Sequence, residues 1–176
     1  KVIAQTAINK TFENTLCNIV SEKTIVNAII GLLATGGSTN HTIHLIAIAK
    51  AAGIIINWDD FSDLSDIIPL LTRVYPNGAA DVNHFHAAGG MGFLIQTLLE
   101  NGLLHNDVNT ILGFGLDKYT KEPKIKENKL VWEEGPKKSL NESIIREVSN
   151  PFQLKSGLRM MSGNIGRAVM KISAID

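Results

Sequence analysis

The first half of the chain alternates apolar helical stretches with short polar turns. Apolar positions from Ile25 to Leu33 cover most of a helical circumference, which predicts a buried helix, and Thr24 is a suitable N-cap. The pair Gly36-Gly37 ends that helix. A second apolar run predicts a helix over residues 38–52. The β-branched residues at 54–58 then predict a short buried strand.

Polar caps continue to mark helices further along. Asp60 is a candidate N-cap for a short helix that ends near Pro69. Asp81 can cap a helix that extends to Ala88. An amphipathic run over residues 91–99 predicts the next helix.

The second half shows strand-like patterns. We expect one strand at 110–114 and a surface excursion over 117–138 that contains one short strand at 129–132. Residues 158–175 predict one or two strands joined through 162–166. Because helices alternate with strands, the pattern favours an α/β fold with layered elements.

Composition and charge narrow the function classes. The chain has 176 residues, 44% of them hydrophobic, which fits one ordinary domain with a core. Its 17 basic and 17 acidic residues cancel, which argues against a bulk nucleic-acid binder. We see no run of about 18 apolar residues and therefore expect no membrane span.

The single cysteine and the two ends add further expectations. Cys17 has no partner cysteine, so we expect a packing or incidental thiol and a reducing, cytoplasmic compartment. The chain begins at Lys1 and ends in a strand-like pattern, so we interpret it as a piece of a longer protein whose isolated form exposes apolar surface.

The most informative stretch follows the glycine pair. Gly37 is followed by Ser38, Thr39 and Asn40 at the start of the second helix. The free N–H groups of a helix start and the positive end of its dipole suit a carboxylate or a phosphate. The stretch matches neither the Gly-x-Ser-x-Gly pattern of serine hydrolases nor a Walker-type phosphate loop. A tight helix–helix turn without a ligand is the structural alternative.

Four histidines flank this stretch in two pairs. His41 and His44 lie three residues apart on one helix face, and His84 and His86 form the second pair. Together they could ligate a metal only if the two segments meet. We favour the interpretation that some of these histidines are satisfied by hydrogen bonds and that one or two line a pocket. A histidine there could donate a hydrogen bond to a bound anion or act as an acid–base group.

Two charged runs carry less chemistry. Residues 59–66 are rich in aspartate but lack the glycine and the closing glutamate of a calcium loop, so we interpret them as a solvated acidic helix start. The lysines of residues 117–138 could approach a phosphorylated ligand, but a solvated face is the favoured interpretation.

The ordered series of motifs resembles one enzyme family. The segment Ala34-Thr35-Gly36-Gly37-Ser38-Thr39-Asn40-His41 is similar to the middle of the dihydroxy-acid dehydratase and 6-phosphogluconate dehydratase family. Further similar segments follow in the same order and favour the 6-phosphogluconate branch; they span residues 56–65, 74–78, 80–90, 102–105 and 162–171.

This resemblance implies a hydro-lyase as the full-length enzyme. Its substrate would be 6-phosphogluconate, a small sugar-acid phosphate, converted to 2-dehydro-3-deoxy-6-phosphogluconate in the Entner–Doudoroff pathway. The resemblance also implies a [4Fe–4S] cluster acting as Lewis acid, allows for magnesium, and suggests a homodimer. A branched-chain dihydroxy acid as substrate and a non-catalytic α/β anion-binding module are the alternatives.

The family signatures that carry the reactive chemistry are absent from this chain. Neither the cysteine-containing Cys-Asp-Lys signature nor the downstream signature of the proposed serine base occurs, so no catalytic residue or metal ligand is assigned here. Residues 1–150 are expected to end a layered α/β N-terminal domain, and 151–176 to begin a β-rich C-terminal domain. The predicted substrate-binding residues are Gly37, Ser38, Thr39, Asn40 and His41, with His84 and His86 as a second wall.

Overall fold

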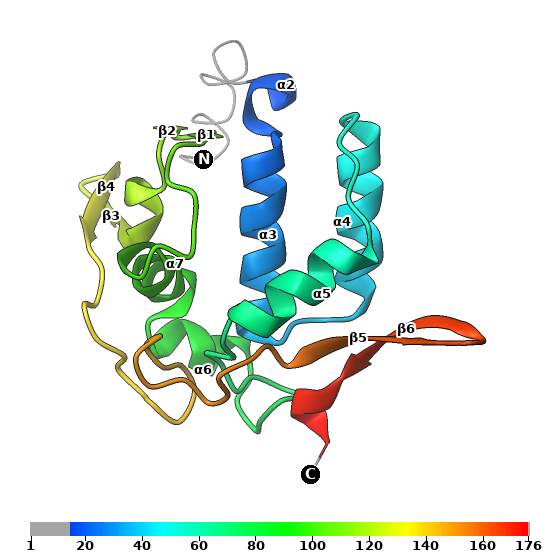
Figure 1. Cartoon of the computed structure of the whole chain (residues 1–176). Helices are drawn as coiled ribbons and strands as arrows, with labels where there is room; N and C mark the ends of the chain where they lie inside the picture. Colours follow the sequence, from blue (N-terminus) through cyan, green and yellow to red (C-terminus); the bar gives the residue numbers. More distant parts are fainter. Residues whose placement is uncertain (1–14, 176) are drawn as a thin grey trace.

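A computed structural model describes residues 15–175 (Figure 1). The α-helices in this part of the chain are α2 (Leu16–Ile19), α3 (Glu22–Thr35), α4 (Asn40–Ala51), α5 (Trp58–Ile67), α6 (Val82–Ala87) and α7 (Gly90–Glu100). Two 3₁₀ turns, η1 (Asp117–Thr120) and η2 (Ile172–Ala174), follow. The strands are β1 (Asn109–Thr110), β2 (Gly113–Phe114), β3 (Lys121–Lys126), β4 (Lys129–Glu134), β5 (Leu158–Gly163) and β6 (Gly166–Lys171).

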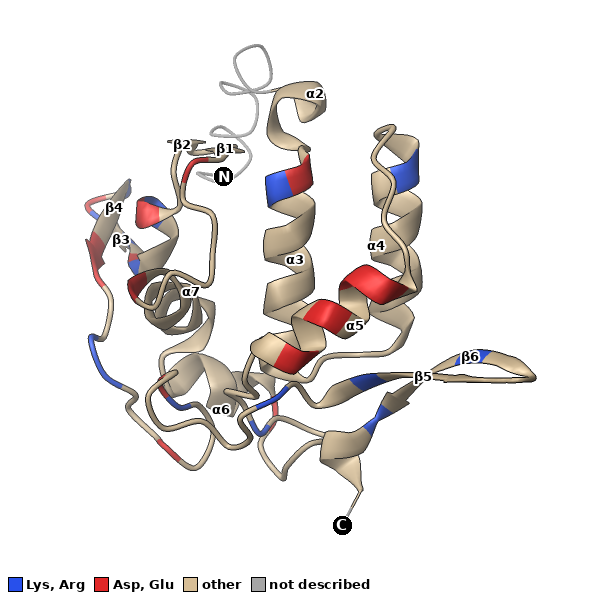
Figure 2. Ribbon diagram, in the orientation of Figure 1, with Lys and Arg blue, Asp and Glu red and all other residues tan. Residues whose placement is uncertain are grey.

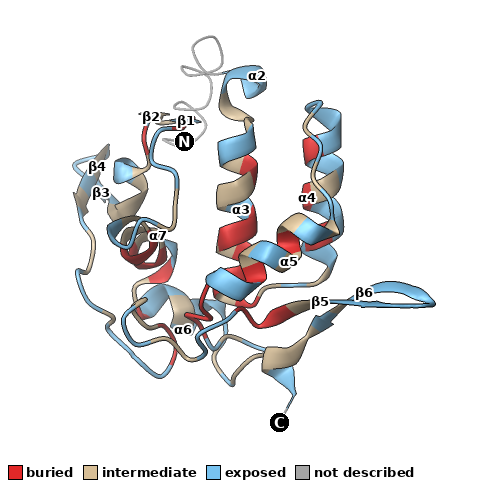
Figure 3. Ribbon diagram, viewed as in Figure 1, coloured by how far each residue is buried: buried red, intermediate tan, exposed pale blue. Residues whose placement is uncertain are grey.

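Helix α3 lies at the centre of the hydrophobic core. Six of its residues are buried, as its all-round apolar pattern predicts. They pack with Phe61 of α5, with Phe93 and Leu94 of α7, and with Leu158 at the start of β5. Figure 3 shows this buried material along α3 and α7, whereas the tip of the β5–β6 hairpin is exposed.

The predicted helices are present, but two of their caps were assigned wrongly. Ser21, and not Thr24, is the N-cap of α3, since its hydroxyl accepts from the Thr24 N–H and Thr24 closes the capping box. In the same way Asn57, and not Asp60, caps α5, because its side chain accepts from the Asp59 N–H at 2.6 Å while Asp60 accepts from the Asn57 N–H. The third cap, Asp81 on α6, is confirmed.

The strand predicted at 54–58 is wrong. Ile54 and Ile56 pack against the core and Ile55 is 93% exposed, so the side chains alternate as in a strand. No strand among residues 15–175 pairs with this segment, and the Asn57 cap commits Trp58 to the start of α5. The segment is an extended connection.

All sheets in the described part are antiparallel hairpins of two strands. The single strand predicted at 110–114 is wrong; it is the small β1–β2 hairpin. The excursion at 117–138 contains β3 as well as β4, joined by Glu127 and Asn128, both with positive φ (49° and 61°). Of the one or two strands predicted over 158–175, two are present as the β5–β6 hairpin, and η2 follows them. The predicted mixture of helices and strands is thus present.

Two extended connections fasten the C-terminal hairpin to the end of α3. The Leu71 N–H donates to the carbonyl of Ala34 at 2.8 Å, and the Leu70 N–H donates to the carbonyl of Gln153 at 3.0 Å. The Ser156 hydroxyl donates to the carbonyl of Leu33. These bonds bring residues 70–77 and the base of β5–β6 beside the glycine turn that ends α3 (Figure 1).

In the part of the chain that the structure describes, every helix is too short or too polar to cross a bilayer.

Candidate functional site

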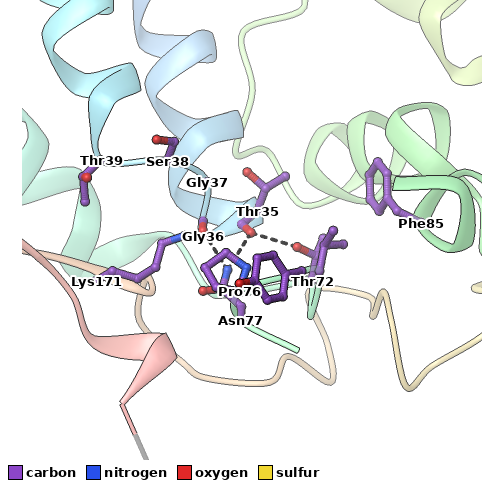
Figure 4. Close-up of a pocket in the computed structure, with 12 residues that line it drawn as sticks. Thr35, Gly36, Gly37, Ser38, Thr39, Thr72, Pro76, Asn77, Phe85 and Lys171 are labelled. Carbon is purple, nitrogen blue, oxygen red and sulfur yellow. Dashed lines mark hydrogen bonds between the residues drawn. The ribbon is translucent and has the colours of Figure 1, made fainter. Parts of the chain in front are cut away.

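A cavity of about 460 Å³ opens beside the C-terminal end of α3 (Figure 4). It is formed where the α3–α4 turn, the connection that follows α5, helix α6 and the end of β6 come together. The lining residues are mostly small, apolar or hydroxyl-bearing and include no carboxylate; they are Thr35, Gly36, Gly37, Ser38, Thr39, Thr72, Val74, Tyr75, Pro76, Asn77, Phe85 and Lys171.

The glycine turn forms one wall and has a structural reason for its composition. Gly36 adopts a left-handed conformation (φ 57°), and its N–H donates back to the last carbonyls of α3. The Asn77 amide donates to the Gly36 carbonyl at 2.7 Å and to the Thr35 carbonyl at 3.3 Å. A Cβ at Gly36 would collide with this amide, so the close approach requires glycine.

Helix α4 begins at the rim of the cavity. Thr39 is its N-cap but makes no capping bond with its side chain, and the Asn40 N–H donates to the Ser38 hydroxyl oxygen at 3.3 Å. Among residues 15–175, no acceptor pairs with the backbone N–H groups of Ser38 and Thr39. These donors and the positive end of the α4 dipole are available to an anion.

Lys171 is the only basic residue in this lining. Its ammonium group is directed toward the Gly36–Gly37 turn (Figure 4). Partial burial lowers the pKa of Lys171 from its ordinary value, because desolvation disfavours the charged form. The sequence analysis missed this residue as a ligand candidate. Period-two alternation places Lys171 on the same strand face as the half-buried Val169, and that signal could have found it.

The predicted anion-binding residues line three neighbouring cavities, and Gly37 and Thr39 each line two of them. Gly37, Ser38 and Thr39 line the first cavity. Asn40 lines a second cavity of about 300 Å³ between α4, α5 and the β5–β6 hairpin. His41 lines a third, largely apolar cavity of about 390 Å³ between α3, α4 and α7.

The sequence that contains the glycine turn matches a known protein family. The family model described as the dihydroxy-acid/6-phosphogluconate dehydratase N-terminal domain matches residues 1–119. The chain belongs to this family of dehydratases.

Named relatives refine this assignment. The chain is 59% identical over 160 residues to the phosphogluconate dehydratase of Pseudomonas aeruginosa, covering 91% of this chain and 26% of that protein. It is 54% identical over 176 residues to the phosphogluconate dehydratase of Rhizobium meliloti, covering 99% of this chain and 29% of that protein. The dihydroxy-acid dehydratase of Caldanaerobacter subterraneus is 34% identical over 160 residues, covering 90% and 26%. The chain therefore spans between a quarter and a third of the length of these relatives.

The second histidine pair of this dehydratase chain lies on α6, next to the cavity. His84 closes the capping box of that helix, with its Nδ1 atom 2.9 Å from the Asp81 carboxylate. His84 and His86 are exposed and are not among the residues that line the cavity, whereas Phe85 between them is. A wall formed by the two histidines stays a prediction.

The described residues of this dehydratase chain include a single cysteine. Cys17 is exposed on the short helix α2. Within residues 15–175, no three side chains of histidine, cysteine, aspartate or glutamate come close enough to share a metal ion. Iron–sulfur clusters are normally held by several thiolates, and Cys17 alone does not provide such a set.

Some charged residues of the two runs form ion pairs, and Figure 2 shows where the charged residues lie along the ribbon. The lysines of β3 form ion pairs within the β3–β4 hairpin: Lys121 with Glu134, Lys124 with Glu122 and Glu133, and Lys126 with Glu133. The aspartates of α5 are only in part a solvated face. Asp66 binds Lys155 and Arg159, and Asp59 binds Arg167, all from the C-terminal hairpin or the residues before it.

Proposed function

We propose that this chain is part of a hydro-lyase that dehydrates 6-phosphogluconate to 2-dehydro-3-deoxy-6-phosphogluconate, a step of the Entner–Doudoroff pathway. The observation that carries the proposal is the difference in identity over the same segment. Phosphogluconate dehydratases match at 52–59%, against 34% for a dihydroxy-acid dehydratase. Substrate-specific residues within this segment would account for that difference.

The geometry supports a substrate-binding role for the glycine turn. The α3–α4 turn presents two backbone N–H groups and two hydroxyl groups at the rim of a cavity that holds one ammonium group and no carboxylate. A sugar-acid phosphate carries a carboxylate at one end and a phosphate at the other, so either end is complementary to this lining. The chain would form one wall of the active site and would not dehydrate the substrate alone.

Other parts of the proposal concern the full-length protein. We place the [4Fe–4S] cluster, any magnesium ion and the catalytic base in parts of the enzyme outside this chain. Residues 1–150 would complete the N-terminal α/β domain and residues 151–176 would begin the β-rich C-terminal domain. We further propose a cytoplasmic homodimer without nucleic-acid or membrane partners.

A substrate comparison tests the activity. The full-length enzyme, with its cluster reconstituted, is assayed with 6-phosphogluconate and with a branched-chain 2,3-dihydroxy acid. We expect kcat/KM for 6-phosphogluconate to be at least about a hundredfold higher, the size of difference that binding one additional charged group can supply. A preference for the branched-chain acid would move the chain to the other branch of the family. No turnover of either substrate by the reconstituted enzyme would favour a non-catalytic anion-binding module.

Substitution of the hydroxyl residues tests the site. Ser38→Ala and Thr39→Ala in the full-length enzyme should each raise KM for 6-phosphogluconate by about threefold to tenfold, the effect of one lost neutral hydrogen bond. Ser149→Ala, at an exposed serine that does not line the cavity, is the matched control and should leave KM unchanged. If kcat and KM stay at wild-type values in both variants, the glycine turn has only a structural role.

A further inference from the structure

The cavity contains one positive charge for which the described structure provides no counter-ion. The other two basic residues of the same hairpin are paired: Arg159 with Asp66 at 2.5 Å and Arg167 with Asp59 at 2.8 Å. Lys171 forms no ion pair with any carboxylate of residues 15–175, and no aspartate or glutamate lines the cavity around it. A half-buried ammonium group in these surroundings calls for an anion from elsewhere.

The position of Lys171 is fixed from both sides of the hairpin. Lys171 pairs in register with Leu158, which is fully buried in the core. Immediately after Lys171, the N–H of Ile172 donates to the carbonyl of Gly157 at 2.8 Å. The lysine therefore projects from an anchored backbone rather than from the exposed tip of the hairpin.

A side-chain bridge links this backbone to the glycine turn. The Ser173 hydroxyl donates to the Oδ1 atom of Asn77 at 2.8 Å, and the Asn77 amide donates to the Gly36 carbonyl at 2.7 Å. Asn77 thus uses its acceptor toward the Lys171 segment and its donor toward the turn. The bridge ties the segment that carries Lys171 to the glycine turn that precedes α4.

The free donors on the opposite wall complete the arrangement. Thr35 and Thr72 use their hydroxyl protons on backbone carbonyls. No acceptor among residues 15–175 takes the hydroxyl protons of Ser38 and Thr39. Lys171 and these two residues therefore present donors from three positions of one cavity.

We propose that Lys171 binds an anionic group of the substrate, a carboxylate or a phosphate, in the cavity between the end of β6 and the glycine turn, and that Ser173 positions Lys171 through Asn77. This inference rests on the proposed function for the identity of the substrate. The charge and the hydrogen-bond donors of the cavity are the same whichever substrate the enzyme uses.

The experiment uses the full-length enzyme with Lys171→Met, and Lys50→Met as the matched control. Lys50 is an exposed lysine in the last turn of α4 and lines neither this cavity nor the two beside it. Loss of one charge-assisted hydrogen bond should raise KM for 6-phosphogluconate by about tenfold to a hundredfold in Lys171→Met. Lys50→Met should match the wild type, and Lys171→Arg should recover part of the loss. An unchanged KM in a folded Lys171→Met enzyme overturns the proposal.

Two competitive inhibitors identify the anion. If Lys171 binds the phosphate, Lys171→Met should weaken inhibition by inorganic phosphate and leave inhibition by gluconate unchanged. If Lys171 binds the carboxylate, gluconate should lose inhibition and inorganic phosphate should not. Equal inhibition of wild type and variant by both compounds also overturns the proposal.

A binding measurement separates this inference from the proposed function. Thermal stabilisation of the wild-type and variant enzymes by 6-phosphogluconate, inorganic phosphate and gluconate does not require turnover. If the wild type dehydrates no 6-phosphogluconate but the stabilisation by an anion still depends on Lys171, only the proposed function fails. If turnover is present and all stabilisation is independent of Lys171, only this inference fails.

The positioning role has its own readout. Ser173→Ala should raise KM by about twofold to fivefold with kcat unchanged, since it removes one neutral hydrogen bond from the bridge. In the double variant Lys171→Met/Ser173→Ala, the second substitution should add nothing, because Ser173 acts through the lysine. A fully additive effect in the double variant would contradict the positioning role.

Discussion

The two long hairpins of the described structure have the same architecture and opposite uses of charge. β3–β4 and β5–β6 are both antiparallel pairs of six-residue strands. In β3–β4 the three lysines of β3 pair with glutamates of the same hairpin, so these charges are satisfied locally. In β5–β6 the arginines pair with aspartates of α5, and Lys171 lines a cavity (Figure 4).

The difference shows what connects a hairpin to a site. When the ion pairs of a hairpin lie within the hairpin, they do not determine its orientation relative to the rest of the fold. A hairpin such as β5–β6, whose arginines pair with another element, is oriented by that element. Its third basic residue, Lys171, is positioned together with the hairpin. The base of β5–β6 adds a buried anchor, Leu158, whereas no residue of β3–β4 is buried.

The largest expected effect tests this anchor. Leu158→Ala removes a fully buried side chain from the core and should cost about 2–5 kcal/mol of unfolding free energy. Hydrogen exchange of the full-length enzyme, resolved by peptide, should show the loss of protection at residues 158–171. Ile125→Ala in β3, at a side chain that is 58% exposed, is the control and should change stability by no more than about 0.5 kcal/mol. Equal costs for the two substitutions would remove the contrast between the hairpins.

A smaller effect is expected from the ion pairs that orient β5–β6. Asp66→Asn removes the partner of both Lys155 and Arg159, and these contacts also lower the pKa of Asp66. Because the pairs are solvent-exposed, hydrogen exchange of residues 158–171 should accelerate by only about twofold to fivefold. Asp63→Asn, one turn earlier on α5 and without an ion pair among residues 15–175, is the control. If exchange is as slow as in the control, the buried residue Leu158 at the start of β5 is sufficient to orient the hairpin.

The contrast between the hairpins also separates what local patterns could predict from what they could not. Helix existence and the β5–β6 hairpin followed from periodicity and from a glycine-containing turn. The N-caps of α3 and α5 were misplaced because Ser21 and Asn57 each compete with a second good capping residue three positions later, and both residues take part in one capping box. The strand expected at 54–58 was wrong because alternation describes an extended segment and cannot show whether a neighbouring strand exists.

The candidate site divides in the same way. The glycine turn with Ser38 and Thr39 was predictable, because its composition reflects local backbone geometry. Alternation along β6 could mark Lys171 as facing inward, but its place beside the glycine turn was not predictable, since that depends on the Ser173–Asn77 and Asn77–Gly36 hydrogen bonds, across 96 and 41 residues of sequence separation. The lysine run was a poor guide to the site: its members on β3 are paired with glutamates, whereas the lysine in the cavity lies far from that run in the sequence.

The smallest expected effect sharpens the comparison through titration of a single carboxyl group. Lys124 and Lys126 lower the pKa of Glu133 from 4.5 to about 2, mainly through hydrogen bonds to its carboxylate. Because the folded pKa lies below the ordinary value, the ion pairs contribute stability above about pH 4.5 and lose it as the pH falls toward 2. Lys124→Met should raise the Glu133 pKa toward 4.5, as measured by carboxyl ¹³C shifts, and Lys138→Met should leave it unchanged.

Turnover at neutral pH should stay at the wild-type rate in both variants, since the lysines of β3–β4 do not line the cavity that holds Lys171. A loss of turnover in Lys124→Met would place the β3–β4 hairpin, and not only β5–β6, at the site.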